Sequence, residues 1–250
     1  MATTRAPAAP LAAYVLHRYD WSETSLIVEL FTRERGRIVV AAKGAKRPHS
    51  QLRPVLLPFQ RLAVQLGRTP ADEAAEVHLL RSAEWAGGAP SVAGAALYSG
   101  FYLNELLLKL LARQDPHERL FDAYGETLAA LADEAPALRA FELVLLRETG
   151  VLPELDVETL TLRPAEAERR YALHPESGLV PDAEGLRGSV WAALEAGLRS
   201  ASRAELRAAC TPFAGALRGP LRKLLHYHLG SAKLRTRQVM LELQKLAEPA

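Results

Sequence analysis

The sequence predicts an α+β protein with a small N-terminal β-barrel and a mainly helical C-terminal domain that contains a short irregular or β segment. Short, apolar and β-branched runs separated by turns fill the N-terminal third of the chain. After the Gly- and Pro-containing stretch 87–94, apolar residues recur with the spacing of amphipathic helices. We therefore expect a disordered lead at 1–10, a barrel domain at 11–86, and a helical domain at 87–250 with an irregular insert at 151–188.

Each of the five predicted strands is bounded by turn residues such as Gly36 and Gly67, and together they cover 12–20, 26–32, 37–43, 58–66 and 76–85. Five short strands in one small domain favour a closed barrel, because closure removes exposed strand edges. The hairpin formed by the second and third strands is basic. A five-stranded barrel with such a hairpin is typical of an OB-fold, which binds oligonucleotides on that face.

Basic charge is concentrated in the stretch 31–54. It holds seven Lys and Arg residues against the single acid Glu34, a formal +6, while the whole chain carries only +2. A basic hairpin that continues into a basic loop suits a phosphate backbone. It equally suits a charged edge that keeps a strand from pairing with other chains. On the first interpretation, the predicted phosphate contacts are Arg35, Arg37, Lys43, Lys46, Arg47 and Arg53.

The helical domain shows repeated start and stop signals. One helix is predicted to start after Asp115 as its N-cap, and Ser202 with Glu205 forms a capping box at the start of another. The other predicted helices are 97–113, 136–150, 189–199, 212–229 and 234–247. A second basic cluster spans 218–245. We expect Arg222, Lys233, Arg235 and Arg237 to form a second DNA surface. The alternative is an exposed helix end whose cations complement the helix dipole.

Composition limits the remaining possibilities. A single cysteine, Cys210, excludes an internal disulfide, and the longest charge-free run, 86–104, is too rich in Gly, Ala, Ser and Pro for a bilayer span. The N-terminus lacks a signal-peptide pattern. No phosphate-binding loop, nucleophile elbow or H-E-x-x-H zinc motif occurs. We expect a cytoplasmic protein that is not an enzyme and needs no cofactor; the carboxylate pairs 156/158 and 166/168 are interpreted as solvated.

Several stretches resemble one family. They are RYDWSETSLIVELFTRERGRIVVAAKGAKRP, LRPVLLPFQRL, LYSGFYLNELLLKLL, RAFELVLLRETG and YHLGSAKLRTRQVMLEL. In this order they resemble the bacterial RecO family of recombination mediators over about 15–245. The resemblance implies an OB-fold, a helical domain and a nucleoid-associated role in recombinational DNA repair. It implies that the protein binds single- and double-stranded DNA and anneals complementary strands. It also implies partners: the single-stranded-DNA-binding protein, RecR, and the RecA recombinase that it helps to load.

The resemblance also implies a docking site for the acidic, apolar C-terminal tail of the single-stranded-DNA-binding protein. Arg139 matches the arginine of the family's L-R-x-F-E-L pattern and would clamp the terminal carboxylate, with Tyr102 and Leu106 as pocket walls. The alternative is an exposed ion pair of Arg139 with Glu142 or Asp133.

One feature departs from the family. Many members carry four cysteines in the segment that corresponds to 151–188 and look like zinc proteins, whereas this segment holds no cysteine. His174 alone cannot hold a structural zinc, so we expect no metal.

The aromatic residues of the barrel have different predicted roles. Trp21 lies in a polar loop and is the better candidate for stacking on a base, and Phe59 is expected in the core. Phe31 suits the barrel core and a stacking position equally well. Two other functions remain open on the residues alone. One is an adaptor whose OB-fold binds protein, with DNA binding incidental; the other is an RNA-binding OB protein.

Overall fold

A computed structural model of the chain describes residues 9–67, 76–87, 92–200, 202–230, 234–236 and 238–239. The chain divides into two compact units. The barrel unit comprises 1–91 together with 111–121, and the helical unit comprises 92–110 together with 122–250. The segment 111–121, which the sequence prediction assigns to the helical domain, thus belongs with the barrel.

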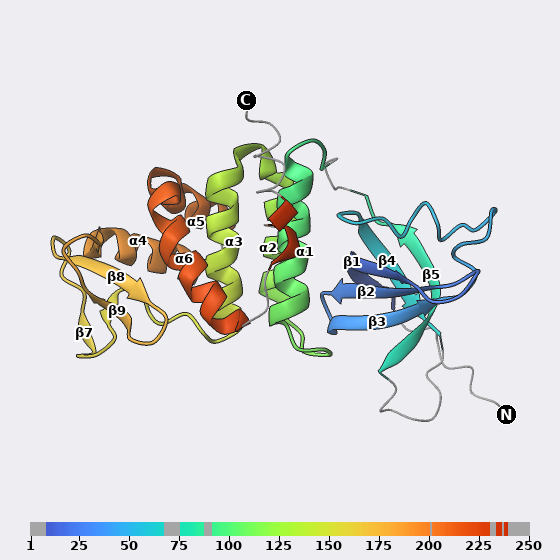
Figure 1. The fold of residues 1–250 in the computed structure, drawn as a ribbon, viewed down its shortest axis with the longest axis horizontal. Helices are drawn as coiled ribbons and strands as arrows, with labels where there is room; N and C mark the ends of the chain where they lie inside the picture. Colours follow the sequence, from blue (N-terminus) through green and yellow to red (C-terminus); the bar gives the residue numbers. More distant parts are fainter. Residues whose placement is uncertain are drawn as a thin grey trace. The chain divides into compact units, whose positions relative to one another are not determined.

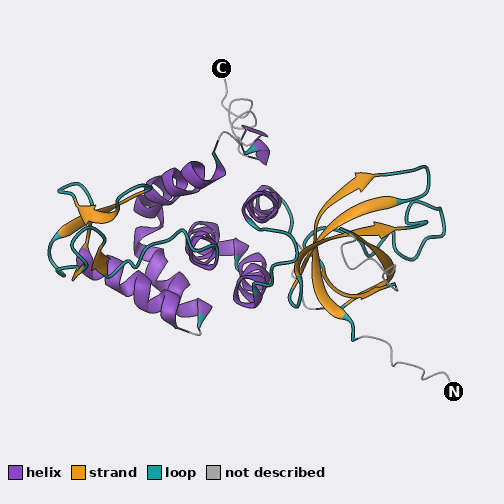
Figure 2. Ribbon diagram, turned by 90° about the horizontal axis from the view of Figure 1, so that it is seen from below, coloured by secondary structure: helices purple, strands orange, loops and turns teal. Residues whose placement is uncertain are grey.

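Five strands form the barrel, in the order β1-β2-β3-β5-β4, and β4 pairs with β1 to close it (Figures 1 and 2). The strands are β1 (Leu11–Asp20), β2 (Leu26–Thr32), β3 (Gly36–Ala42), β4 (Arg61–Leu66) and β5 (Val77–Trp85). β3 and β5 are parallel, and all other neighbours are antiparallel. The predicted five-stranded OB-type barrel is confirmed, with strand ends that differ from the prediction by at most three residues.

The barrel interior follows from the two-residue alternation of the strands. Ala13, Val15, Val28, Leu30 and Val40 point inwards and are almost completely buried. Their sequence neighbours on β2 and β3 therefore point outwards, onto the face that OB-folds use for ligands.

The segment 111–121 covers part of this outer face. The ring of Phe121 lies 5.1 Å from that of Tyr14 and 5.4 Å from that of Phe31. The Gln114 amide donates to the Arg37 carbonyl at 2.9 Å. Gly36 has a φ of +64°, and a Cβ there would overlap the carbonyl of Asp115, so only glycine fits the turn and the contact together.

Asp115 therefore does not cap a helix. α2 (Glu118–Ala129) begins three residues later than the predicted cap. The backbone of Asp115 lies against the β2–β3 turn, and this contact fixes the chain before the helix can start.

The helical unit contains α1 (Ala96–Leu110), the main part of α2, α3 (Glu134–Glu148), α4 (Gly188–Arg199), α5 (Arg203–Cys210) and α6 (Ala214–Leu229). Two 3₁₀ turns, η1 (Leu131–Asp133) and η2 (Thr211–Phe213), precede α3 and α6. The predicted cap is present: the Ser202 hydroxyl accepts from the Glu205 amide at 3.4 Å. Gly150 follows α3 with a φ of +73°, which glycine tolerates best. No helix among the described residues is long and apolar enough to cross a membrane.

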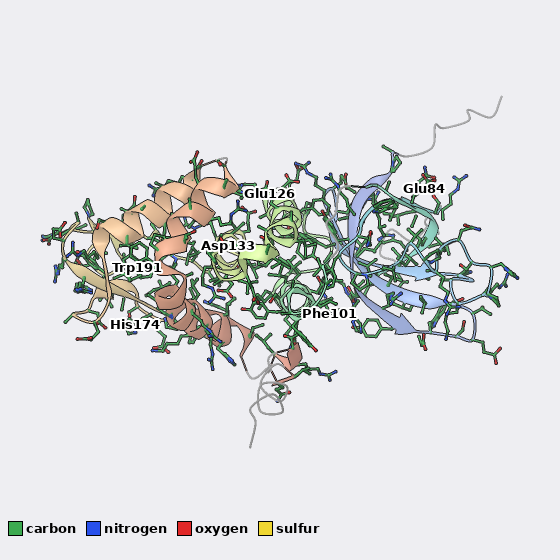
Figure 3. All side chains as sticks on the ribbon, turned by 90° about the horizontal axis from the view of Figure 1, so that it is seen from above. Glu84, Phe101, Glu126, Asp133, His174 and Trp191 are labelled. Atoms are coloured by element: carbon green, nitrogen blue, oxygen red, sulfur yellow. The ribbon has the colours of Figure 1, made fainter. Side chains whose placement is uncertain are left out.

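The insert between α3 and α4 forms two small sheets. β8 (Arg170–His174) lies between β10 (Leu186–Arg187) and β9 (Gly178–Pro181), and β6 (Val157–Glu158) pairs with β7 (Arg163–Pro164). The indole of Trp191, labelled in Figure 3, donates to the Tyr171 carbonyl at 3.0 Å. Within the described ranges, no group of three or more His, Cys, Asp or Glu side chains could hold a metal ion. The absence of zinc stays a prediction.

Candidate nucleic-acid interface and partner site

The basic loop, residues 43–54, follows β3 and holds most of the predicted phosphate contacts. Lys43, Arg47 and Arg53 are exposed and have no ion-pair partner in the part of the chain that the structure describes. Gly44, with a φ of +72°, turns the chain directly after Lys43. The loop therefore offers cations that are free to meet phosphate oxygens.

Lys46 joins the basic loop to the β1–β2 loop. Its amide donates to the Thr24 carbonyl at 2.9 Å, and its Nζ donates to the Ser22 carbonyl at 3.1 Å. Nζ also lies 3.3 Å from Asp20 Oδ1. Because two of these contacts involve backbone atoms, the two loops are held side by side, and Lys46 is partly neutralised.

The two arginines at the β2–β3 turn have different surroundings. Arg35 is exposed, and its amide donates to the Thr32 hydroxyl at 3.1 Å. Arg37 instead lies under the segment 111–121, with a side chain only 16% exposed and its Nη1 3.7 Å from the buried Glu29 carboxylate. The Arg37 guanidinium thus faces the buried Glu29 carboxylate and not solvent, unlike the predicted phosphate contact. We leave Arg37 out of the proposed phosphate contacts.

The second basic cluster is described only in part. Arg222 on α6 and Arg235 are exposed, whereas Lys233 and Arg237 lie outside the described residues. The amides of Arg235 and Thr236 donate to the two oxygens of Glu105 at 2.8 and 3.0 Å, and the Thr236 hydroxyl adds a third bond at 2.7 Å. One carboxylate on α1 therefore fixes the start of this segment.

The aromatic residues of the barrel differ in exposure. Phe59 is buried. Phe31 is also buried, but it lies on the outer face of β2 with its ring 5.4 Å from that of Phe121. Trp21 is 58% exposed. Sequence reasoning missed two further rings on the same strand end, His17 and Tyr19, both exposed. Their spacing of two residues, continued by Trp21, was the available signal, because alternate residues of a strand share a face.

The predicted tail-binding residues form a buried polar cluster within the helical unit. Arg139 Nη2 donates to Glu142 Oε1 at 2.6 Å, and the Tyr102 hydroxyl donates to the same oxygen at 2.7 Å. Burial raises the pKa of Glu142, and burial with the neighbouring Glu142 charge raises that of Tyr102 well above its usual range. Leu106 is fully buried. The pairing of Arg139 with Glu142 is thus present, but it is internal rather than exposed.

A small hollow lies beside α3. Its volume is about 20 Å³, and its walls are mainly small or apolar side chains of α2, α3 and α5. Three charged side chains, those of Glu126, Arg203 and Arg207, also line it. The Nη1 atom of Arg203 is buried and lacks a hydrogen-bond partner among the described atoms. An unsatisfied guanidinium suits an anionic group, whereas the Glu126 carboxylate on the same wall repels one.

The carboxylates of the insert are engaged in ion pairs. Asp156 lies 2.7 Å from Arg199, Glu166 lies 3.5 Å from Arg169, and Glu168 lies 3.1 Å from Arg187. Each of these three carboxylates therefore pairs with an arginine at the surface.

The N-terminal and C-terminal parts of the chain match two models of the same protein family. The family model described as "Recombination protein O N terminal" matches residues 10–87, and the one described as "Recombination protein O C terminal" matches residues 93–238. A protein of Variovorax paradoxus named "DNA repair protein RecO" is 54% identical over 251 residues, which cover 94% of this chain and 96% of that protein. A protein of the same name from Polaromonas sp. is 50% identical over 256 residues, covering 98% and 100%.

Proposed function

Because the chain belongs to the recombination protein O (RecO) family, we propose that it acts in DNA repair as a non-enzymatic recombination mediator that binds DNA and anneals complementary strands. The observation that carries the proposal is the basic loop. Lys43, Arg47 and Arg53 project from an OB-type barrel without internal partners among the described residues. A phosphate backbone supplies the counter-charge that the fold itself does not provide.

The mechanism is electrostatic. Two strands repel each other because each carries a charge at every phosphate. A protein that neutralises phosphates on both strands lowers this repulsion and holds complementary sequences close together. The basic loop provides one such surface, and Arg222 and Arg235, with Lys233 and Arg237, provide the second in this proposal.

A partner extends the mechanism to coated strands. We propose that the helical unit binds the C-terminal tail of the single-stranded-DNA-binding protein, and that the protein acts with RecR to help RecA load. Arg139, Tyr102 and Leu106 remain the proposed tail site. The buried, unsatisfied Nη1 of Arg203 on α5 makes this arginine a second candidate for the carboxylate clamp.

The test is annealing of complementary oligonucleotides, bare and coated with the single-stranded-DNA-binding protein, at two salt concentrations. The proposal predicts annealing of bare strands by the isolated protein, with a rate that falls steeply as salt rises. An adaptor that binds DNA only incidentally would act only when a protein partner is present. Competition between RNA and DNA strands of the same sequence separates the RNA-binding alternative.

A further inference from the structure

We propose that His17, Tyr19 and Trp21 form a row on which unpaired bases stack, so that the barrel prefers single strands to duplex. This inference rests on the proposed function, in which the barrel unit is a DNA interface. It adds what the basic loop cannot supply, because phosphate contacts alone give no preference for the single strand over the more densely charged duplex.

The row exists because the register of β1 shifts. Up to Val15, β1 follows one alternation, and the shift between Val15 and His17 resets it. Beyond the shift, His17 lies opposite Glu29 and Tyr19 lies opposite Ile27. The residues between them on β2 point into the barrel, so His17 and Tyr19 share the outer face.

The rings are exposed and adjacent. The Tyr19 side chain is 48% exposed and that of Trp21 is 58% exposed. The His17 and Tyr19 rings are 4.4 Å apart in an edge-to-face contact. One exposed apolar residue on a surface needs no explanation. His17 and Tyr19 thus form one exposed aromatic surface on β1, and the exposed Trp21 follows two residues later, directly after the end of this strand.

The spacing suits nucleic-acid bases. The Cα atoms of residues two apart on a strand are separated by roughly 6.7 Å, about twice the 3.4 Å rise between successive stacked nucleotides. Because the His17 and Tyr19 rings touch edge to face, bases of an extended single strand stack on the open outer faces of the rings and not between them. Each such contact raises the affinity for a single strand by roughly fivefold to a hundredfold.

The row ends beside the basic loop. Lys46 bonds to the carbonyls of Ser22 and Thr24, the residues that follow Trp21. Lys43 and Arg47 belong to the same loop and lie within three residues of Lys46. A single-strand site combines rings that stack on bases with cations that contact phosphates.

Duplex DNA cannot use the aromatic half. Its bases are already stacked on one another, and exposing one requires unstacking and unpairing, which opposes binding. Loss of the rings should therefore weaken single-strand binding selectively, whereas loss of the cations should weaken binding to both forms. The two contributions are separable by strand type and by salt dependence.

The test uses the full-length protein with an oligo-dT strand and a duplex of equal length. Tyr19→Ala with Trp21→Ala should weaken single-strand binding at least tenfold, weaken duplex binding less than threefold, and leave the salt slope unchanged. Trp85→Ala, which removes a 64% exposed tryptophan from the end of β5, serves as the matched control and should change neither. Equal losses on both DNA forms, or normal single-strand affinity in the double variant, would overturn the stacking row.

Tryptophan fluorescence gives a direct readout. The chain has three tryptophans, and Trp191 is only 1% exposed, so the DNA-sensitive signal can come from Trp21 or Trp85. Quenching by oligo-dT should disappear in Trp21→Phe and persist in Trp85→Phe; the reverse pattern contradicts the row. A wild-type protein that binds neither DNA form would defeat the proposed function and this inference together.

Discussion

Arg113 donates a hydrogen bond from Nη2 to Oε1 of Glu29 at 3.0 Å, across 84 residues of sequence. Glu29 lies on the outer face of β2 with a side chain only 6% exposed. This ion pair holds the segment 111–121 against the barrel. The Nη1 atom of Arg37 on β3 lies 3.7 Å from the same carboxylate. Part of the OB-type face is thus closed by the chain itself, and the open part lies towards the basic loop and the aromatic row.

Replacing Arg113 should destabilise the barrel unit. Arg113→Ala leaves the buried Glu29 with only the longer Arg37 contact, and should lower the free energy of unfolding by about 1–3 kcal/mol. Arg81→Ala, an exposed arginine on β5, should change it by less than about 0.5 kcal/mol. Urea denaturation measures both. Adding Glu29→Gln to Arg113→Ala should recover part of the loss; a strictly additive double variant would show that the pair is not coupled.

Neutralising the basic loop should flatten the salt dependence of DNA binding. Lys43→Gln with Arg47→Gln removes two phosphate contacts and leaves the Lys46 contacts intact. The slope of log affinity against log salt for a single strand should fall by about 1.4, because each contact contributes about 0.7. Arg61→Gln with Arg163→Gln makes the same change in net charge at exposed sites outside both clusters. If both variants gave the same slope, net charge rather than the basic loop would govern binding.

The tail site is testable at two arginines. Arg139→Ala should weaken binding of the tail peptide at least tenfold, about 1.4 kcal/mol, and leave annealing of bare DNA intact. Since Arg139 pairs with the buried Glu142, the single variant also leaves a carboxylate without its cation. Arg139→Ala with Glu142→Gln removes that charge and separates lost stability from lost binding.

Arg203→Ala provides the comparison for this experiment. If the Arg139 variants bind the peptide normally and Arg203→Ala does not, the clamp lies at the hollow beside α3. If Arg139→Ala instead abolishes annealing of bare DNA, the proposed division of work between the two units fails.

Acidification should release the segment that begins at Leu234. Burial raises the pKa of Glu105, but the hydrogen bonds from Thr236 and Arg235, with the charge of Lys109, outweigh it and lower the pKa overall. A lowered folded-state pKa means that this stabilisation is complete above the unfolded value, 4.5, and is lost as pH falls through the folded value. The protection of the Arg235 and Thr236 amides from hydrogen exchange, measured relative to the intrinsic rate at each pH, should therefore fall at acid pH. Glu105→Gln should cause the same loss of protection at neutral pH, and unchanged protection in that variant would contradict the assignment.

The stability of the insert should depend on the Glu195 carboxylate and not on a bound metal. Glu195 is completely buried, lies 2.7 Å from Arg147 and accepts the Leu155 amide at 2.9 Å. Glu195→Ala should cost about 3 kcal/mol of stability, because it leaves the Leu155 amide unpaired and removes the counter-charge of Arg147, which keeps only its bond to the Pro153 carbonyl. A chelator should leave the melting temperature of the wild-type protein unchanged. Stoichiometric zinc in tag-free protein would refute the absence of a metal.

The sequence by itself determined the architecture. Alternating strands such as 26–32, the turn at Gly36 and the capping box at Ser202 are local signals, because each depends on a few neighbouring residues. The family stretches likewise lie within continuous segments. The barrel, most helices and the location of the basic loop therefore needed no tertiary information. The start of α2 did, because the backbone of Asp115 lies against the β2–β3 turn, and the helix predicted at 234–247 lies mostly outside the described residues.

Only the tertiary structure decided which side chains remain available. Arg37 and Lys43 look alike in a basic stretch, yet one is held by Glu29 under a distant segment and the other is exposed. Arg139 and Glu142 form an internal pair, and the shift after Val15 turns His17 and Tyr19 outwards. Burial, long-range pairing and strand register depend on residues far apart in the chain, so no local pattern specifies them.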